Sequence, residues 1–82
     1  MAEQVKIYGA DWCGDTRRAL RVLDTAGVQY DYVNIDGDRE GEKKVIEFNK
    51  GKRRIPLVEI ASETGMQSLS VPSDSELKKA LG

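Results

Sequence analysis

Hydrophobic and polar residues alternate in several short segments of the chain, and a period of two residues predicts β-strands. In the first such segment, Val5 and Ile7 stand between polar neighbours, and the segment ends at Gly9. Pro56 stands near the start of the third segment, where a strand tolerates proline. The predicted strands cover residues 4–9, 30–35, 55–61 and 66–71, with a turn over residues 62–65 between the last two.

Between these strands the apolar positions recur every three or four residues, which predicts amphipathic helices. The first helix covers residues 14–26 and ends at Gly27, and the second lies around Val45, Ile46 and Phe48. The third begins at the capping box formed by Ser73 and Glu76. The element order is therefore βαβαββα. It predicts an α/β fold in which helices flank a four-stranded mixed sheet.

Length and charge restrict the possible functions. The chain has 82 residues and a net charge of −1, which predicts a single domain over residues 1–82 with no field that attracts nucleic acid or an anionic membrane. It contains neither a membrane-length apolar run nor a secretory signal at its start, so we expect a cytoplasmic protein. Histidine is absent, which excludes His-based triads and His metal sites.

The only cysteine, Cys13, stands where the first predicted strand gives way to the first predicted helix. Unpaired amide groups and the helix dipole stabilise a thiolate at a helix N-terminus, and the thiolate is the nucleophile in disulfide exchange. The carboxylate of Asp15 opposes this effect, while Arg17 and Arg18 oppose Asp15. The position predicts a redox or thiol-transfer site, although free cysteines are more often small buried hydrophobes.

Two charged runs each allow two interpretations. The acidic run from Asp36 to Gly41 nearly fits a calcium loop, but a strand precedes it, and we expect it instead at a helix N-terminus, with no metal site. Lys50, Lys52, Arg53 and Arg54 precede Pro56. They form either a solvated loop or a binding site for an anionic thiol or protein partner.

The order of elements, the run Trp12-Cys13-Gly14, Arg18, the tripeptide Arg54-Ile55-Pro56 and the ending Pro72–Leu77 resemble the glutaredoxin family of the thioredoxin superfamily, and most closely its short mycoredoxin-like members. The resemblance covers nearly the whole chain. It implies that Cys13 is the nucleophile and that the bond before Pro56 is cis. It also implies supporting roles for Trp12, Gly14, Asp15, Thr16 and Arg18, and thiol-ligand contacts from Arg54, Ile55, Pro56, Ser70, Ser73 and Asp74.

By the same resemblance, the protein is a monomer that binds no permanent cofactor. Its co-substrate is a low-molecular-weight thiol, glutathione or mycothiol, and its substrates are protein disulfides or mixed disulfides. Thr16 occupies the place of the second cysteine of dithiol glutaredoxins, which implies a monothiol route. The segment Leu69–Pro72 replaces the paired glycines that hold glutathione in many members.

Two other functions stay open on the sequence. A dimer with Cys13 from each chain and two small thiols would hold an iron–sulfur cluster without catalysis. Alternatively, the domain keeps the fold without redox activity and serves as a protein-interaction module.

Overall fold

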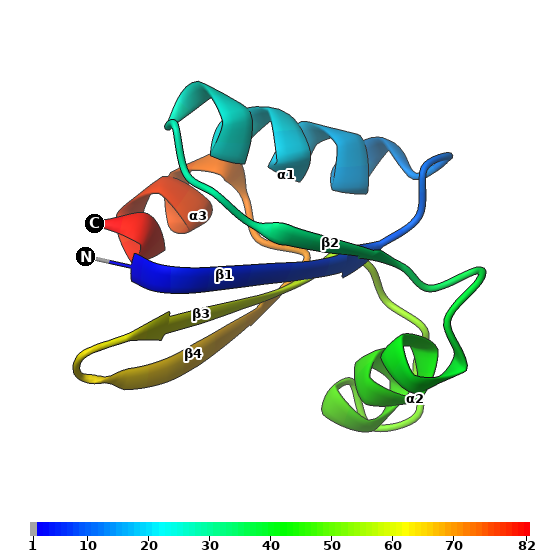
Figure 1. Ribbon diagram of the computed structural model, residues 1–82. Helices are drawn as coiled ribbons and strands as arrows, with labels where there is room; N and C mark the ends of the chain where they lie inside the picture. Colours follow the sequence, from blue (N-terminus) through cyan, green and yellow to red (C-terminus); the bar gives the residue numbers. More distant parts are fainter. Residues whose placement is uncertain (1) are drawn as a thin grey trace.

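The computed structural model describes residues 2–82 and confirms the order βαβαββα (Figure 1). The observed boundaries lie within about two residues of the predicted ones for most elements, while the second helix begins at Arg39, well before its apolar residues. The elements are β1 (Ala2–Gly9), α1 (Gly14–Thr25), β2 (Asp31–Asn34), α2 (Arg39–Phe48), β3 (Leu57–Ser62), β4 (Gly65–Ser70) and α3 (Asp74–Leu81).

The sheet is mixed, as predicted, and its strand order is β2-β1-β3-β4. β1 pairs in parallel with β2 because α1 returns the chain to the same end of the sheet, and β3 runs antiparallel to both β1 and β4. α1 and α3 lie on one face of this sheet and α2 on the other (Figure 1). The fold is therefore the thioredoxin-like α/β fold.

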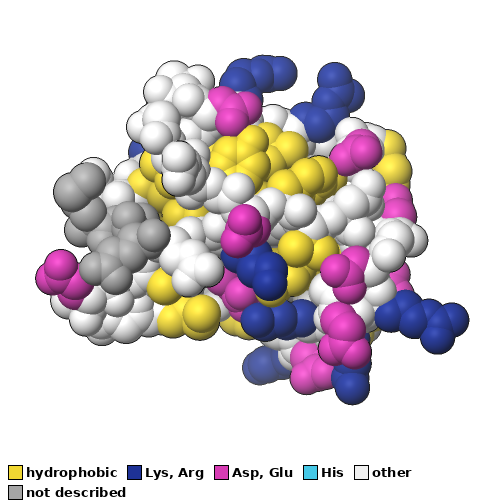
Figure 2. Space-filling view, in the orientation of Figure 1, with side chains coloured by type: hydrophobic (Ala, Val, Ile, Leu, Met, Phe, Trp, Pro, Cys, Tyr) yellow, Lys and Arg dark blue, Asp and Glu magenta, His cyan; other side chains and the backbone are white. Residues whose placement is uncertain are grey.

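Alternation along the central strands divides the core into two clusters. Val5 and Ile7 of β1 join Val58 and Ile60 of β3 under α1 and α3. Tyr8 points to the opposite face and packs with residues that include Val45 of α2. Hydrophobic side chains reach the surface along the line where α1 meets β2, and charged side chains gather around α2 (Figure 2).

A close contact between Gly9 and Thr16 fixes the start of α1 against the end of β1. A Cβ atom at Gly9 would lie 2.5 Å from the Thr16 hydroxyl oxygen, so only glycine lets the strand and the helix approach this closely. Ala10, the next residue, is fully buried. The loop that carries Cys13 thus leaves the sheet from a tightly packed point.

Across residues 2–82, every helix is too short or too polar to span a bilayer.

Candidate active site

Cys13 occupies the N-cap of α1, as the sequence predicts. Its backbone is extended (φ −81°, ψ 120°), its amide donates to the Ala10 carbonyl at 3.1 Å, and its carbonyl accepts the first helical hydrogen bond, from Arg17, at 3.0 Å. The side chain is partly exposed. The sulfur therefore lies at the positive end of the helix dipole and is open to reagents from solvent.

Ile55 and Pro56 lie beside this sulfur. Cys13 Sγ is 4.0 Å from the Ile55 carbonyl oxygen, and the peptide bond between Ile55 and Pro56 is cis, which confirms the expectation from the family resemblance. The Pro56 carbonyl accepts a hydrogen bond from the Val71 amide at 2.8 Å. The segment before β3 thus contacts the sulfur through Ile55 and is held to the residue after β4 through Pro56.

Thr16 lies in the first turn of α1, three residues after Cys13, and is fully buried. Its hydroxyl accepts a hydrogen bond from the Ala10 amide at 3.4 Å. Among the residues that the structure describes, this hydroxyl makes no hydrogen bond to the Cys13 sulfur. The Thr16 side chain therefore joins the end of β1 to α1.

Arg18 connects the starts of two helices. Its guanidinium lies 3.1 Å from an Asp15 carboxylate oxygen and 3.2 Å from one of Asp74, the first residue of α3. The cation therefore counters the Asp15 charge that the sequence places near Cys13.

Ser73 caps α3. Its hydroxyl accepts from the Glu76 amide at 3.1 Å, and its own amide donates to the Glu76 carboxylate at 2.9 Å.

The remaining expected ligand-binding residues lie at the end of β4 and before β3. The Ser70 hydroxyl donates to Asn49 Oδ1 at 2.6 Å, and the Asn49 amide group donates to the Arg54 carbonyl at 3.4 Å. Arg54 itself is exposed. Among residues 4–82, whose side chains the structure describes, its guanidinium has no ion-pair partner, so it is available to an anionic ligand. Gly14, also exposed, begins α1.

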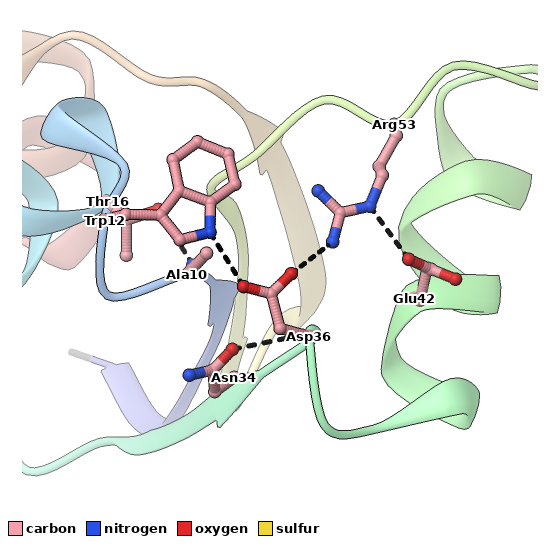
Figure 3. A network of polar contacts seen from close by, with 7 residues as sticks. All are labelled: Ala10, Trp12, Thr16, Asn34, Asp36, Glu42 and Arg53. Atoms are coloured by element: carbon pink, nitrogen blue, oxygen red, sulfur yellow. Dashed lines mark hydrogen bonds and ion pairs between the residues drawn. The ribbon is translucent and has the colours of Figure 1, made fainter.

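A polar network that the sequence did not reveal extends from Trp12 (Figure 3). The Trp12 indole is 66% exposed, and its Nε1 donates to Asp36 Oδ2 at 2.7 Å. The other Asp36 oxygen, Oδ1, accepts from Arg53 at 2.7 Å, and Arg53 Nε donates to Glu42 Oε2 at 2.8 Å. The hydrogen bond from Trp12, and then that from Arg53, lowers the pKa of Asp36 below its ordinary value.

The sequence contained one signal of this network, in the opposite charges of the two runs that hold Asp36 and Arg53. The acidic run lies at a helix N-terminus, as expected, because Asp38 caps α2 by accepting from the Gly41 amide at 3.0 Å.

A second contact that the sequence did not predict involves Tyr32. Its hydroxyl donates to Asp11 Oδ1 at 2.7 Å. Burial and this hydrogen bond raise the pKa of the Tyr32 hydroxyl above its ordinary value.

A thiol at the first strand-to-helix junction, beside a cis-proline at the start of the third strand, defines the class of thioredoxin-like thiol proteins. Residues 5–64 match the family model of glutaredoxin. Mycoredoxin 1 from Corynebacterium glutamicum is 38% identical over 60 residues, which are 73% of this chain and 73% of that protein. The chain belongs to the glutaredoxin family and is mycoredoxin-like.

Solved structures agree with this fold. The glutaredoxin-like protein NrdH-redoxin from Escherichia coli superposes with a TM-score of 0.73 at 21% identity, covering 93% of this chain and 92% of that one. A glutaredoxin from Archaeoglobus fulgidus gives a TM-score of 0.67 at 26% identity, covering 99% of this chain and 87% of that one. The family is that of glutaredoxin-like redox proteins.

Proposed function

We propose that this protein is a monothiol thiol–disulfide oxidoreductase that removes small thiols from protein mixed disulfides, with Cys13 as the nucleophile. The observation that carries the proposal is the position of Cys13: its sulfur is partly exposed, begins α1, and lies 4.0 Å from the Ile55 carbonyl. We further propose that it acts in the cytoplasm as a monomer, without a permanent cofactor.

The reaction has two exchange steps at Cys13. The Cys13 thiolate attacks the small-thiol sulfur of a mixed disulfide, a new disulfide forms between Cys13 and the small thiol, and the protein thiolate leaves with the electron pair and takes a proton from solvent. A second small thiolate then attacks the small-thiol sulfur on Cys13. This step releases an oxidised small-thiol dimer and restores the Cys13 thiolate.

The surface around Cys13 offers contacts for the small thiol. The backbone of Ile55 and Pro56 lies beside the sulfur, and the exposed Arg54 supplies a cation for a carboxylate. Ser70, Ser73 and Asp74 lie on the segment that ends β4 and begins α3. Because their side chains already hold Asn49, Glu76 and Arg18, these three residues would mainly shape the surface. The co-substrate is glutathione or mycothiol.

The test is release of a free thiol from two peptides, one carrying a mixed disulfide with glutathione and the other with mycothiol. We expect the protein to release at least one of them and Cys13→Ser to release neither above background, with the small thiol found on Cys13 by mass spectrometry. Release of neither thiol would contradict the proposal. Visible absorbance after anaerobic purification would instead support the cluster-binding dimer.

A further inference from the structure

The carboxylate of Asp36 lies between two segments that flank Cys13. Trp12 immediately precedes the nucleophile, and Arg53 stands two residues before Ile55, whose carbonyl faces the sulfur. Asp36 binds both, Trp12 through Oδ2 and Arg53 through Oδ1, each at 2.7 Å (Figure 3). One side chain therefore links the segment that carries Cys13 to the segment that carries Ile55.

Asp36 is itself held in place. Its backbone amide donates to Asn34 Oδ1 at 3.0 Å, just beyond the end of β2 (Figure 3). Arg53 is held from its other side by Glu42 of α2, at 2.8 Å. The network thus rests on β2 and α2, and the carboxylate has a fixed position from which to orient the indole.

The exposure of the network indicates what it contributes. The side chains of Arg53 and Asp36 are 33% and 44% exposed, and ion pairs with this much solvent contact add little to the free energy of unfolding. Trp12 stays 66% exposed although its N–H group is bound, so much of this residue, which directly precedes Cys13, faces solvent. Such a fixed, exposed ring suits contact with an incoming substrate better than it suits packing.

We propose that Asp36 is a positioning residue for disulfide exchange: it holds Trp12 and Arg53 in fixed places on either side of Cys13, so that a mixed disulfide meets a preformed surface. This inference rests on the proposed function. Positioning lowers the cost of ordering the reacting groups at the moment of attack, and small displacements around a reacting atom reduce rates strongly.

The experiment compares Asp36→Ala with a matched charge control, Asp31→Asn. In the part of the chain that the structure describes, Asp31 is exposed and has no side-chain partner. For a peptide mixed disulfide with glutathione or mycothiol, we expect Asp36→Ala to lower kcat/KM about tenfold, the effect of losing a charge-assisted hydrogen bond, and Asp31→Asn to leave it unchanged. Alkylation of Cys13 by iodoacetamide, which needs only the sulfur, should change less than about twofold.

Trp12 provides a readout that is independent of catalysis because it is the only tryptophan in the chain. In Asp36→Ala, the fluorescence anisotropy of Trp12 should fall and quenching by acrylamide should rise, while the unfolding midpoint stays within the error of the control. A double-mutant cycle with Trp12→Phe, which cannot donate the hydrogen bond, should show coupling in kcat/KM.

The outcomes separate the two proposals. If Asp36→Ala frees the indole but exchanges disulfides at the original rate, Asp36 is a surface link without a role in exchange, and the proposed function stands. A joint fall in exchange and alkylation would also contradict the positioning role, because the variant then damages the thiol itself. If the unaltered protein exchanges neither mixed disulfide, the proposed function fails and the positioning role fails with it.

Discussion

The sulfur of Cys13 and the carbonyl oxygen of Ile55 lie 4.0 Å apart, although 42 residues separate them in the chain. The contact forms because β1 and β3 are neighbours in the sheet, so that the loop after β1 and the residues before β3 meet at one end of the two strands. The start of α1 and the residues just before β3 thereby form one site.

Thr16→Cys should convert the protein into a dithiol protein. The substituted side chain lies in the first turn of α1, three residues after Cys13, which is close enough for a disulfide within one helical turn. Under mild oxidation we expect the mass of the intact protein to fall by the mass of two hydrogen atoms, as a disulfide forms. We also expect Cys13 to resist alkylation. Thr25→Cys, about 18 Å along the same helix from Cys13, is the control and should form no internal bridge.

Because Thr16 is fully buried, the thiol introduced there should also react more slowly with iodoacetamide than Cys13 does in the reduced variant. Peptide mapping after partial alkylation measures this order. If no bridge forms, or if the introduced thiol reacts first, the described packing of the first turn is wrong.

Gly9→Ala should destabilise the fold by about 1–3 kcal/mol, the usual cost of overpacking a core. The added methyl group would lie 2.5 Å from the Thr16 hydroxyl oxygen. Urea unfolding measures the loss. Gly37→Ala, where an added Cβ has no neighbour within 4 Å, is the control. Adding Thr16→Ala to Gly9→Ala should recover part of the lost stability, and failure to do so would place the strain elsewhere.

Val71→Gly should leave the stability nearly unchanged. Val71 has a φ of 46°, in the left-handed region that costs a β-branched residue about 1–2 kcal/mol, and glycine relieves this strain while losing a half-buried side chain. The control is Val33→Gly in β2, also half-buried but with ordinary backbone, which should lose about 1–3 kcal/mol. Equal losses in thermal unfolding for the two variants would argue against strain at Val71.

Ser73→Ala should lower the stability by about 1 kcal/mol, the common cost of removing a helix N-cap. The substitution leaves the Glu76 amide without its acceptor at the start of α3. Ser75→Ala in the same helix removes an exposed hydroxyl that has no hydrogen bond among the described residues, and thermal unfolding should show little change. A Ser75→Ala loss as large as that of Ser73→Ala would mean that the cap contributes nothing specific.

The contact between Trp12 and Asp36 should depend on pH in one direction. The pKa of Asp36 is lowered, first by the Trp12 hydrogen bond, so the charged contact is complete above the ordinary value of 3.8 and is lost as the pH falls through the lower folded value. Trp12 fluorescence should therefore stay constant from pH 7 to 4 and change only below 3.8.

Circular dichroism over the same range separates this local change from acid unfolding. In Asp36→Asn the side chain no longer titrates, so the local fluorescence transition should disappear. A transition that persists in the variant would belong to another group near Trp12.

Much of the fold followed from local patterns. The alternation around Val5 and Ile7 and the capping box at Ser73 each act over a few residues, so the sequence predicted their elements closely. The first turn of α2 is polar and carries no apolar period, so only the acidic run from Asp36 to Gly41 indicated that this helix begins near Arg39. Position in the chain predicted that Cys13 begins a helix, and the family resemblance predicted the cis bond before Pro56; the structure shows both.

The sequence by itself determined the order of the elements, the lone thiol at a helix start and the absence of a second cysteine, because these depend on residue identity and short-range periodicity. Only the tertiary structure decided which partners polar side chains take when the two residues lie far apart in the chain. Asp36 reaches Trp12 across 24 residues and Arg53 across 17, and Arg18 reaches from α1 to Asp74 of α3. Such contacts depend on how strands and helices pack in three dimensions, and no local pattern encodes them.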